Sequence, residues 1–226
     1  MKDIYLLCIE TSGVSCSVAI AKNGISFVEK GENIGQFTHS EKLHIFIEQA
    51  LKEANITFDT LDAIAVSGGP GSYTGLRIGV SAAKGLCFAK RKPLIVLPTL
   101  QILAKQVDSC IIIPMLDARR MEVYSAVFNQ QHLQQEPTKA VILQADSYRH
   151  WLEQGKVVFL GDGAEKFSKI CQHPNAIFIS DAFPKASDMC ALAFEKFKNQ
   201  AFEDIAYFEP DYLKPFHTTA AKSGNS

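Results

Sequence analysis

The sequence lacks the features of several protein classes. Its six cysteines form no C-x-x-C pair and lie mostly inside apolar runs, which favours buried free thiols in a reducing compartment over disulfides. No apolar stretch approaches the roughly 18–20 residues that cross a membrane. The first residues lead directly into a strand pattern without a cleavage site behind them. We therefore expect a cytoplasmic protein with no membrane contact.

An excess of charge of one sign is also lacking. Lys and Arg together number 23 and Asp and Glu 24, so the chain has no basic excess that would indicate nucleic-acid binding by itself. The 226 residues are 47% hydrophobic with a mean hydropathy of +0.03, which predicts a sizeable core. Domains usually have roughly 100–150 residues, so this length suits one large domain or two small ones.

The first half of the chain has the pattern of a mixed α/β unit. Residues 4–10 and 17–21 are apolar strands, and Asn23-Gly24 is a hairpin signal that predicts a third strand over residues 25–30. Residues 39–55 carry apolar side chains three and four positions apart, which predicts an amphipathic helix. The elements predicted after it are a buried strand over 61–67, a glycine loop, a second helix over 74–91 and a strand over 93–97.

The second half repeats this order without sequence identity. Residues 110–117 form an apolar strand that ends in an acid, as residues 4–10 do, and a later strand leads into Gly161-Asp162-Gly163 and a helix. The repeat predicts an α/β protein with two lobes and mixed sheets rather than one continuous sheet. The predicted divisions are an N-terminal lobe over 1–107, a C-terminal lobe over 108–216 whose last helix can pack back on the first lobe, and a flexible tail over 217–226.

The glycine loop over residues 67–75 has the position of a phosphate loop but not its sequence. It stands between a buried strand and a helix, where backbone amides and the helix dipole favour an anion. A Walker loop needs Lys-Ser/Thr after its final glycine, whereas Gly75 is followed by Leu76-Arg77. The dinucleotide pattern needs a glycine where Thr74 stands. Simple nucleotide binding by this loop is therefore disfavoured.

The helix over residues 74–91 is apolar nearly all round. Only Arg77, Ser81 and Lys84 form a narrow polar strip. Such a helix is either buried on several sides or meets a second body, and small residues four apart, such as Gly75 and Gly79, let another helix approach closely. Burial in the chain's own core and contact with a partner both remain open on this pattern.

Polar residues at strand ends form a second candidate site. Glu10 and Asp117 end equivalent strands in the two lobes and can face each other across a cleft that holds a magnesium nucleotide. Acids at strand ends equally cap turns, so this pattern is a weak signal. The residues that we assign to weak cofactor binding are Glu10, Ser12, Asp117, Gly161 and Gly163.

Five segments, in chain order, resemble the bacterial TsaB (YeaZ) family. They are Ile9-Glu10-Thr11-Ser12, Ser40-Glu41, residues 67–79, residues 117–124 and residues 209–213. The third, Ser-Gly-Gly-Pro-Gly-Ser-Tyr-Thr-Gly-Leu-Arg-Ile-Gly, is highly specific, and together the segments span nearly the whole chain. The resemblance implies the actin-like (sugar kinase/Hsp70-type) ATPase fold with two duplicated lobes. It also implies a part in making N6-threonylcarbamoyladenosine at position 37 of tRNA.

The same resemblance implies that the chain is not itself an enzyme. The catalytic paralogue, the TsaD-type transferase, follows Ile-Glu-Thr-Ser with Cys-Asp-Glu-Thr and carries a metal-binding His-x-x-x-His motif after its glycine loop. Here Gly13-Val14-Ser15-Cys16 and residues 96–101 stand in those places, without the acids or the histidines. We expect no catalytic residue, no metal and no required cofactor in this chain, with any ATP or ADP held at a shared interface.

The resemblance also implies that the two helices of the first lobe form an interface. The implied partners are a TsaD-type transferase that the chain binds and activates, a TsaE-type P-loop ATPase, tRNA mainly through the complex, and a second copy of the chain through the same helices. The residues implied at or beside the interface are Leu43, Phe46, Ile47, Gly75, Leu76, Gly79, Val80 and Ala83. The alternatives are a small ATP-binding kinase or ATPase of the same fold, a metalloprotease and an RNA-binding module.

Overall fold

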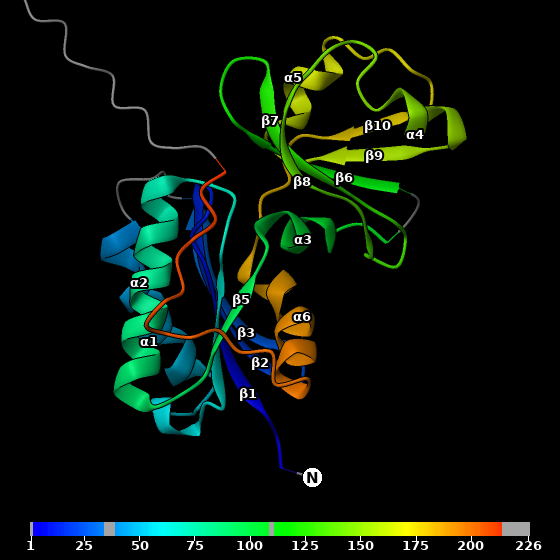
Figure 1. Ribbon diagram of the computed structural model, residues 1–226. Helices are drawn as coiled ribbons and strands as arrows, with labels where there is room; N and C mark the ends of the chain where they lie inside the picture. The colour runs from blue at the N-terminus through cyan, green and yellow to red at the C-terminus, as the bar shows by residue number, and fades with distance from the viewer. Residues whose placement is uncertain (1, 34–38, 109–110, 214–226) are drawn as a thin grey trace, which may run out of the picture.

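The computed structural model describes residues 2–33, 39–108 and 111–213, which form two lobes, one above the other (Figure 1). Each lobe is built on a five-stranded sheet. The predicted tail over 217–226 lies outside the described residues. Among the helices that the structure describes, none has both the length and the apolar character required to span a bilayer.

Sheet A forms the first lobe. Its strands are β1 (Tyr5–Glu10), β2 (Ser15–Lys22), β3 (Ile25–Asn33), β4 (Ala63–Ser67) and β5 (Leu94–Leu97), in the spatial order β3-β2-β1-β4-β5. β1 is antiparallel to β2 and parallel to β4, and β5 is parallel to β4. The β2–β3 hairpin turns at Asn23 and Gly24 with φ angles of 52° and 85°, which explains the Asn-Gly sequence.

Sheet B forms the second lobe. Its strands are β6 (Ile111–Asp117), β7 (Glu122–Phe128), β8 (Gln134–Ile142), β9 (Val157–Leu160) and β10 (Ala176–Ile179). Their order is β8-β7-β6-β9-β10, with β6 antiparallel to β7 and parallel to β9. This is the order and the mixture of directions found in sheet A. The predicted α/β class and the repeat of one strand order in two lobes with mixed sheets are confirmed.

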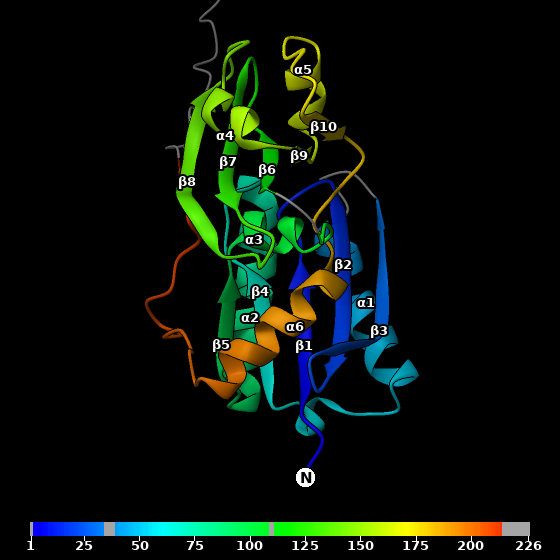
Figure 2. The same cartoon turned by 90° about the vertical axis from the view of Figure 1, so that its right-hand side faces the viewer.

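Helices cover both faces of sheet A. They are α1 (His39–Glu53) and α2 (Tyr73–Lys90) on one face and α6 (Ala186–Lys198) on the other, and a short 3-10 helix, η2 (Phe58–Thr60), leads from α1 into β4. Side chains along β1 alternate accordingly: Leu7 and Ile9 pack under α1 and α2, while Leu6 and Cys8 pack with α6. Figure 2 shows α6 lying across the strands on its face.

A short helix, α3 (Thr99–Ala104), joins the lobes. Its Ile102 packs in the core under α6, whereas Leu100 and Leu103 pack in the second lobe with Ile112. The chain therefore enters the second lobe at α3 and returns with α6. By its packing α6 lies on the first lobe, although it follows all of sheet B in sequence.

The second lobe has shorter helices and an aromatic core. α4 (Arg149–Gln154) and α5 (Ala164–Ser168) contribute side chains to one face of sheet B. There the Phe159 ring centroid lies 4.9 Å from that of Phe167 and 5.3 Å from that of Phe178, with Tyr148 at 5.7 Å. Rings at these separations stabilise a core beyond the area that they bury.

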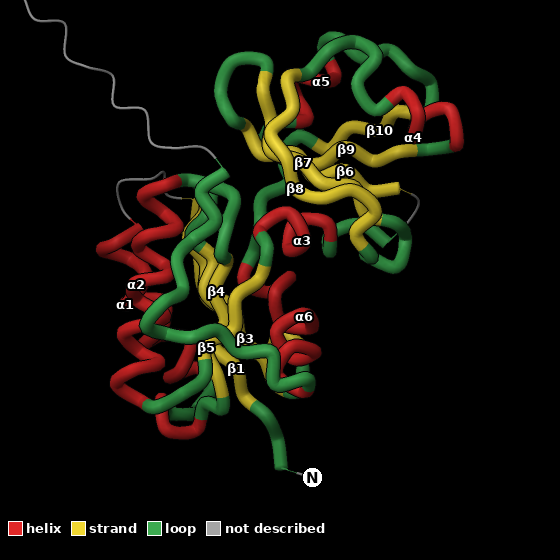
Figure 3. Tube along the Cα trace, in the orientation of Figure 1, coloured by secondary structure: helices red, strands yellow, loops and turns green. Residues whose placement is uncertain are grey.

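After α6 the chain runs up beside α2 as an irregular segment, residues 203–213, which we call the strap (Figure 3). Glu203 pairs with Leu94 of the edge strand β5. Phe208 packs against the core of the first lobe, and Lys84 of α2 donates hydrogen bonds to two strap carbonyls. The strap thus covers an edge of sheet A that would otherwise present unpaired backbone groups.

The described cysteines are all buried free thiols, as predicted; they are Cys8, Cys16, Cys87, Cys171 and Cys190. Burial raises the pKa of Cys16 and of Cys87 to about 12, so both thiols stay protonated and unreactive at neutral pH. Cys110 lies outside the described residues.

Candidate functional site

Polar residues gather at the carboxyl ends of the parallel strands of sheet A, where ligands bind in open α/β sheets. Glu10 ends β1, Ser67 ends β4, and Thr99 follows β5. Glu10 is buried, and its Oε1 accepts hydrogen bonds from the backbone N–H of Ser12 at 2.6 Å and from the Ser67 hydroxyl at 3.0 Å. The structure therefore brings together two of the predicted site residues, Glu10 and Ser12.

Glu10 is a buried carboxyl with no ion pair among the described residues. Burial raises its pKa, hydrogen bonds from Ser12 and Ser67 partly offset this, and the nearby carboxylate of Asp188 raises the pKa further. Glu10 Oε2, Ser12 Oγ and Thr99 Oγ1 have no hydrogen-bond partner within the described parts of the chain. Buried polar atoms of this kind are normally paired, so a donor brought by water or a ligand would find acceptors here.

The glycine loop between β4 and α2 is filled by its own chain. A Cβ on Gly75 would lie 2.0 Å from the carbonyl oxygen of Thr11, so only glycine fits against that backbone. The amides of Ser72 and Gly75 already donate hydrogen bonds, to the Ser12 carbonyl at 2.6 Å and to the Ser72 hydroxyl at 3.2 Å. A phosphate cradle requires free amides. The contacts of the loop thus agree with its departure from phosphate-loop sequences.

The strap closes this loop from outside. The Asp211 amide donates to the Gly68 carbonyl at 2.8 Å. Gly69 has a φ of 112°, and a Cβ on it would lie 2.6 Å from the Asp211 carbonyl oxygen, so glycine is required on both grounds. The next residue, Tyr212, places its ring centroid 4.7 Å from that of Tyr73 at the start of α2. In this structure the glycine loop holds the strap.

Asp117 ends the equivalent strand of sheet B in a different environment. Its side chain is 48% exposed, and its Oδ1 accepts hydrogen bonds from Lys166 Nζ at 2.7 Å and from the Arg119 amide at 2.5 Å. No hydrogen bond or ion pair joins Glu10 to Asp117 among the residues that the structure describes. Each acid makes its contacts within its own lobe.

The Gly161-Asp162-Gly163 turn packs against β6. A Cβ on Gly161 would lie 2.2 Å from the Met115 carbonyl oxygen, and the Gly163 amide donates to that oxygen at 3.1 Å. Asp162 Oδ1 accepts from the Asp117 amide at 2.8 Å. The two predicted glycines therefore set the close approach of this turn to β6.

The eight residues that the resemblance places at or beside the partner interface lie in the core of this chain, so they do not form its exposed surface. Their side chains are at most 8% exposed where a value is given, and the two glycines are buried as well; the residues are Leu43, Phe46, Ile47, Gly75, Leu76, Gly79, Val80 and Ala83. α2 is apolar on most sides, so its sequence does not show which apolar stripe faces the sheet. The stripe of α2 that faces outward is the opposite one.

The exposed side of α2 carries Thr74, Arg77, Ser81, Gly85 and Phe88, which we call the α2 outer face. Their spacing of three and four places them on one side of the helix. Phe88 is 81% exposed, and nothing lies within 4 Å of a Cβ built on Gly85. On the neighbouring helix α1, Ile45 is 46% exposed. This side combines small residues with uncovered apolar side chains.

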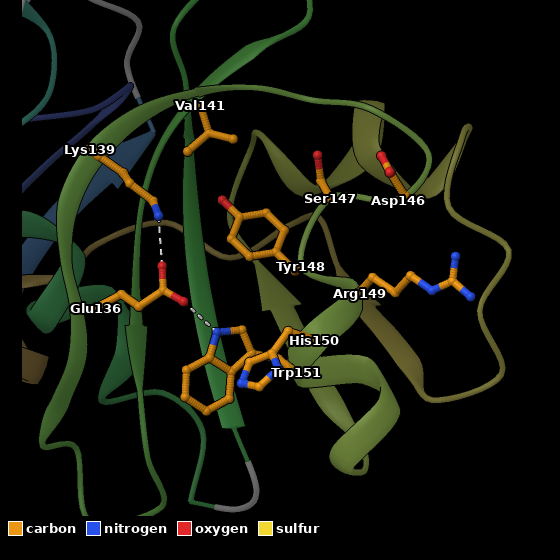
Figure 4. A pocket seen from close by; sticks show the side chains of 9 residues that line it. All are labelled: Glu136, Lys139, Val141, Asp146, Ser147, Tyr148, Arg149, His150 and Trp151. Carbon is orange, nitrogen blue, oxygen red and sulfur yellow. Dashed lines mark hydrogen bonds and ion pairs between the residues drawn. The ribbon is translucent and has the colours of Figure 1, made fainter.

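A cavity of about 350 Å³ opens on the second lobe, and none of the predicted site residues lines it (Figure 4). Lys139 and Trp151 point toward Glu136, whose Oε2 and Oε1 accept their hydrogen bonds at 2.6 Å each. These bonds lower the pKa of Glu136. The carboxylate is thus already paired. Across the described ranges, no group of three or more His, Cys, Asp and Glu side chains is placed to bind a metal.

Two parts of the site region were not predicted from the sequence. Asp188 and Thr99 reach Glu10's end of the sheet from segments distant in sequence, and no local pattern marks them. The strap has no periodicity, but Glu209-Pro210-Asp211-Tyr212-Leu213 was one of the segments carrying the resemblance. That motif was the available signal that the strap serves a specific contact.

Comparison with known proteins gives matches along most of the chain. The family model described as "TsaD: tRNA N6-adenosine threonylcarbamoyltransferase" matches residues 33–223. The tRNA threonylcarbamoyladenosine biosynthesis protein TsaB of Haemophilus influenzae is 26% identical over 95% of both chains. A crystal structure described as YeaZ from Pseudomonas aeruginosa has a TM-score of 0.81 and 27% identity and covers 93% of this chain and all of that one.

The transferases themselves match over a shorter region. The tRNA N6-adenosine threonylcarbamoyltransferase of Bacillus anthracis is 42% identical over 109 residues, which covers 42% of this chain and 32% of that protein. The chain therefore spans about a third of the length of the curated transferases that it matches.

Proposed function

The chain belongs to the protein family described by the TsaD model and matches TsaB (YeaZ) proteins over nearly its whole length, and from this premise we propose that it serves tRNA threonylcarbamoyladenosine biosynthesis as a non-catalytic subunit. It binds a TsaD-type transferase and holds it in an active form. The proposed complex includes a TsaE-type P-loop ATPase, and tRNA is met mainly through the complex.

The observation that carries the non-catalytic role is the closed glycine loop. A glycine loop between a strand and a helix N-terminus is a common place for a phosphate, but Thr11 and Ser12 fill this loop from one side and Asp211 from the other. Its glycines serve close backbone contacts rather than an anion. A chain that uses its glycine loop to assemble itself is suited to a structural contribution.

The proposed binding surface is the exposed side of the helix pair on the first lobe. Ser81 and Gly85 let a partner helix approach α2 closely, and Phe88 offers an apolar side chain for burial. The same surface serves a second copy of the chain when the transferase is absent. We propose no cofactor requirement for the chain alone, with ATP or ADP bound at the interface with the transferase.

Reconstitution tests this function directly. tRNA modification is measured with the transferase, the P-loop ATPase and tRNA, with and without this chain. We expect activity to depend on the chain and to be lost with Phe88→Glu, which places a charge on the α2 outer face, while the exposed Ile142→Glu on β8 leaves it unchanged. Full activity without the chain would refute the proposal.

A small ATP-binding kinase or ATPase is the second candidate, and one observation favours it. Glu10 Oε2, Ser12 Oγ and Thr99 Oγ1 are buried polar atoms without partners at the strand ends, where this fold type binds ligands. Calorimetric titration of the isolated chain with ATP and Mg²⁺ decides between the two. Tight, magnesium-dependent binding that Glu10→Gln abolishes would favour the ATPase.

A further inference from the structure

The strap and α2 together present the two most exposed large apolar side chains among the described residues. Tyr207 on the strap is 85% exposed and Phe88 on α2 is 81% exposed. Lys84 links them: it lies one helical turn before Phe88, and its Nζ donates to the carbonyl oxygens of Ala206 at 3.5 Å and Phe208 at 3.0 Å, on either side of Tyr207. Two segments distant in sequence therefore expose aromatic rings beside the same lysine.

The inner side of the strap is firmly attached, which fixes the position of Tyr207. Phe208 packs against the core of the first lobe, and the Asp211 amide bonds to Gly68. Farther along, Tyr212 accepts a hydrogen bond from Arg77 Nε at 3.4 Å, and the Arg77 guanidinium lies 4.1 Å from the centroid of the Tyr73 ring. Because the strap is held at several points, little freedom remains to be lost when Tyr207 is covered by a partner.

We propose that the strap is part of the surface that binds the paralogous transferase, so that the transferase covers Phe88 and Tyr207 together. This inference rests on the proposed function and extends its interface beyond the helices. The transferase is the occupant because Tyr207 continues the α2 outer face, where Ser81 and Gly85 admit a partner helix. Rigid exposed aromatics at the centre of such a surface contribute most of the binding energy in many interfaces.

Binding of the purified full-length chain to the purified transferase tests the inference. We compare the dissociation constants of the wild type, Phe88→Ala, Tyr207→Ala and Lys84→Met. Ile142→Ala is the matched control, because Ile142 is 69% exposed on the other lobe. We expect at least a tenfold loss for each aromatic variant, a smaller loss for Lys84→Met because it removes the two hydrogen bonds on either side of Tyr207 while the other contacts of the strap remain, and no change for the control. Thermal unfolding of the aromatic variants stays as in the wild type, since both rings are exposed.

The outcomes separate the two levels of the proposal. If Phe88→Ala weakens binding and both Tyr207→Ala and Lys84→Met bind as the wild type does, the strap inference is overturned and the proposed function stands. If Tyr207→Ala alters only self-association, measured by light scattering, the surface serves a second copy and the inference is likewise overturned. Failure of the wild type to bind the transferase overturns both. Slower amide exchange of residues 203–213 in the complex supports the inference.

Discussion

The two lobes share one strand order but differ in what covers their sheets. Sheet A is covered by helices of 15, 18 and 13 residues, α1, α2 and α6, whereas sheet B is covered by α4, α5 and the shared α3, of six, five and six residues. A long helix has an outward side as well as an inward one, and on α2 that side exposes Phe88. The first lobe therefore exposes a helix side that a partner can cover, whereas the short helices α4 and α5 of the second lobe pack into its own core.

The acids at the ends of the equivalent strands β1 and β6 also differ between the two lobes. Glu10 in the first lobe is buried and shares its Oε1 with neighbouring donors, while Asp117 in the second is half-exposed and paired with Lys166. Equivalent strand ends therefore place one carboxyl in a buried site without an ion pair and the other in a half-exposed ion pair.

Removing an aromatic ring from the second lobe has the largest expected effect. Phe159 is fully buried against Phe167 and Phe178, so Phe159→Ala should lower the free energy of unfolding by about 3–5 kcal/mol. Because α3 packs in both lobes, we expect one cooperative transition in calorimetry. Early, separate melting of the second lobe would show that the lobes are independent units.

A side chain at Gly75 comes next. Gly75→Val places its Cβ against the Thr11 carbonyl and should destabilise the first lobe by about 3 kcal/mol, measured by denaturant unfolding. Gly85→Ala on the same helix is the matched control, since its Cβ meets open space. That substitution should stabilise the chain by about 0.8 kcal/mol through helix propensity. Equal effects of the two would contradict the close approach.

Lys166 should be the strongest single polar contact of the second lobe. Its Nζ donates to Asp117 Oδ1 and to the carbonyls of Arg120 and Glu122 at 2.7, 2.8 and 2.7 Å, and its side chain is only 14% exposed. Lys166→Met should cost about 2 kcal/mol of unfolding free energy. Local amide exchange in the β6–β7 turn should rise with it, and a change confined to the first lobe would contradict the assignment.

The smallest effects are expected for the two strand-end acids, whose substitutions should change stability at pH 7 in opposite directions. Burial raises the pKa of Glu10 above its ordinary value of 4.5, so the folded state binds this proton more tightly than the unfolded state. Its contribution to stability is therefore greatest below pH 4.5 and is lost as pH rises toward the folded pKa. Glu10→Gln should raise the melting temperature at pH 7 but not at pH 4.

Asp117→Asn is the comparison for that variant. It weakens an exposed ion pair with Lys166 and should lower stability at pH 7 by less than about 1 kcal/mol. Melting curves of both variants at the two pH values test the contrast. The same sign for both at pH 7 would refute the idea that the equivalent acids stand in opposite environments.

Much of the fold could be predicted from local patterns. The strands of sheet A, the Asn23-Gly24 hairpin and both long helices appear within a few residues of their predicted bounds, because alternation and three-to-four spacing act over short distances. The short elements α3, α4 and β10 were not predicted, since four to six residues hold too little periodicity. The last helix, α6, begins at Ala186, whose amide donates a hydrogen bond to Ser17 Oγ on a strand distant in sequence, so no local pattern fixes this start.

The site was harder to predict than the fold. Glu10 and Ser12 do lie together, but whether an acid is buried depends on what packs over it, and Asp188 and Thr99 come from elsewhere in the chain. Which stripe of α2 faces outward could not be predicted for the same reason. A helix with apolar residues on most sides is oriented by the sheet beneath it, and that sheet is not encoded in the helix's own periodicity.

The return of α6 to the first lobe affects how the chain folds during its synthesis on the ribosome. Sheet B and its helices α4 and α5 form one continuous stretch, residues 111–179. One face of sheet A, in contrast, is covered only when residues 186–198 have been synthesised, and its edge only when the strap has been synthesised. The lobe that is synthesised first is thus completed last. Until then the small apolar side chains under α6, including Ala19 and Ala65, stay uncovered, and this face is where a nascent chain would need protection from aggregation.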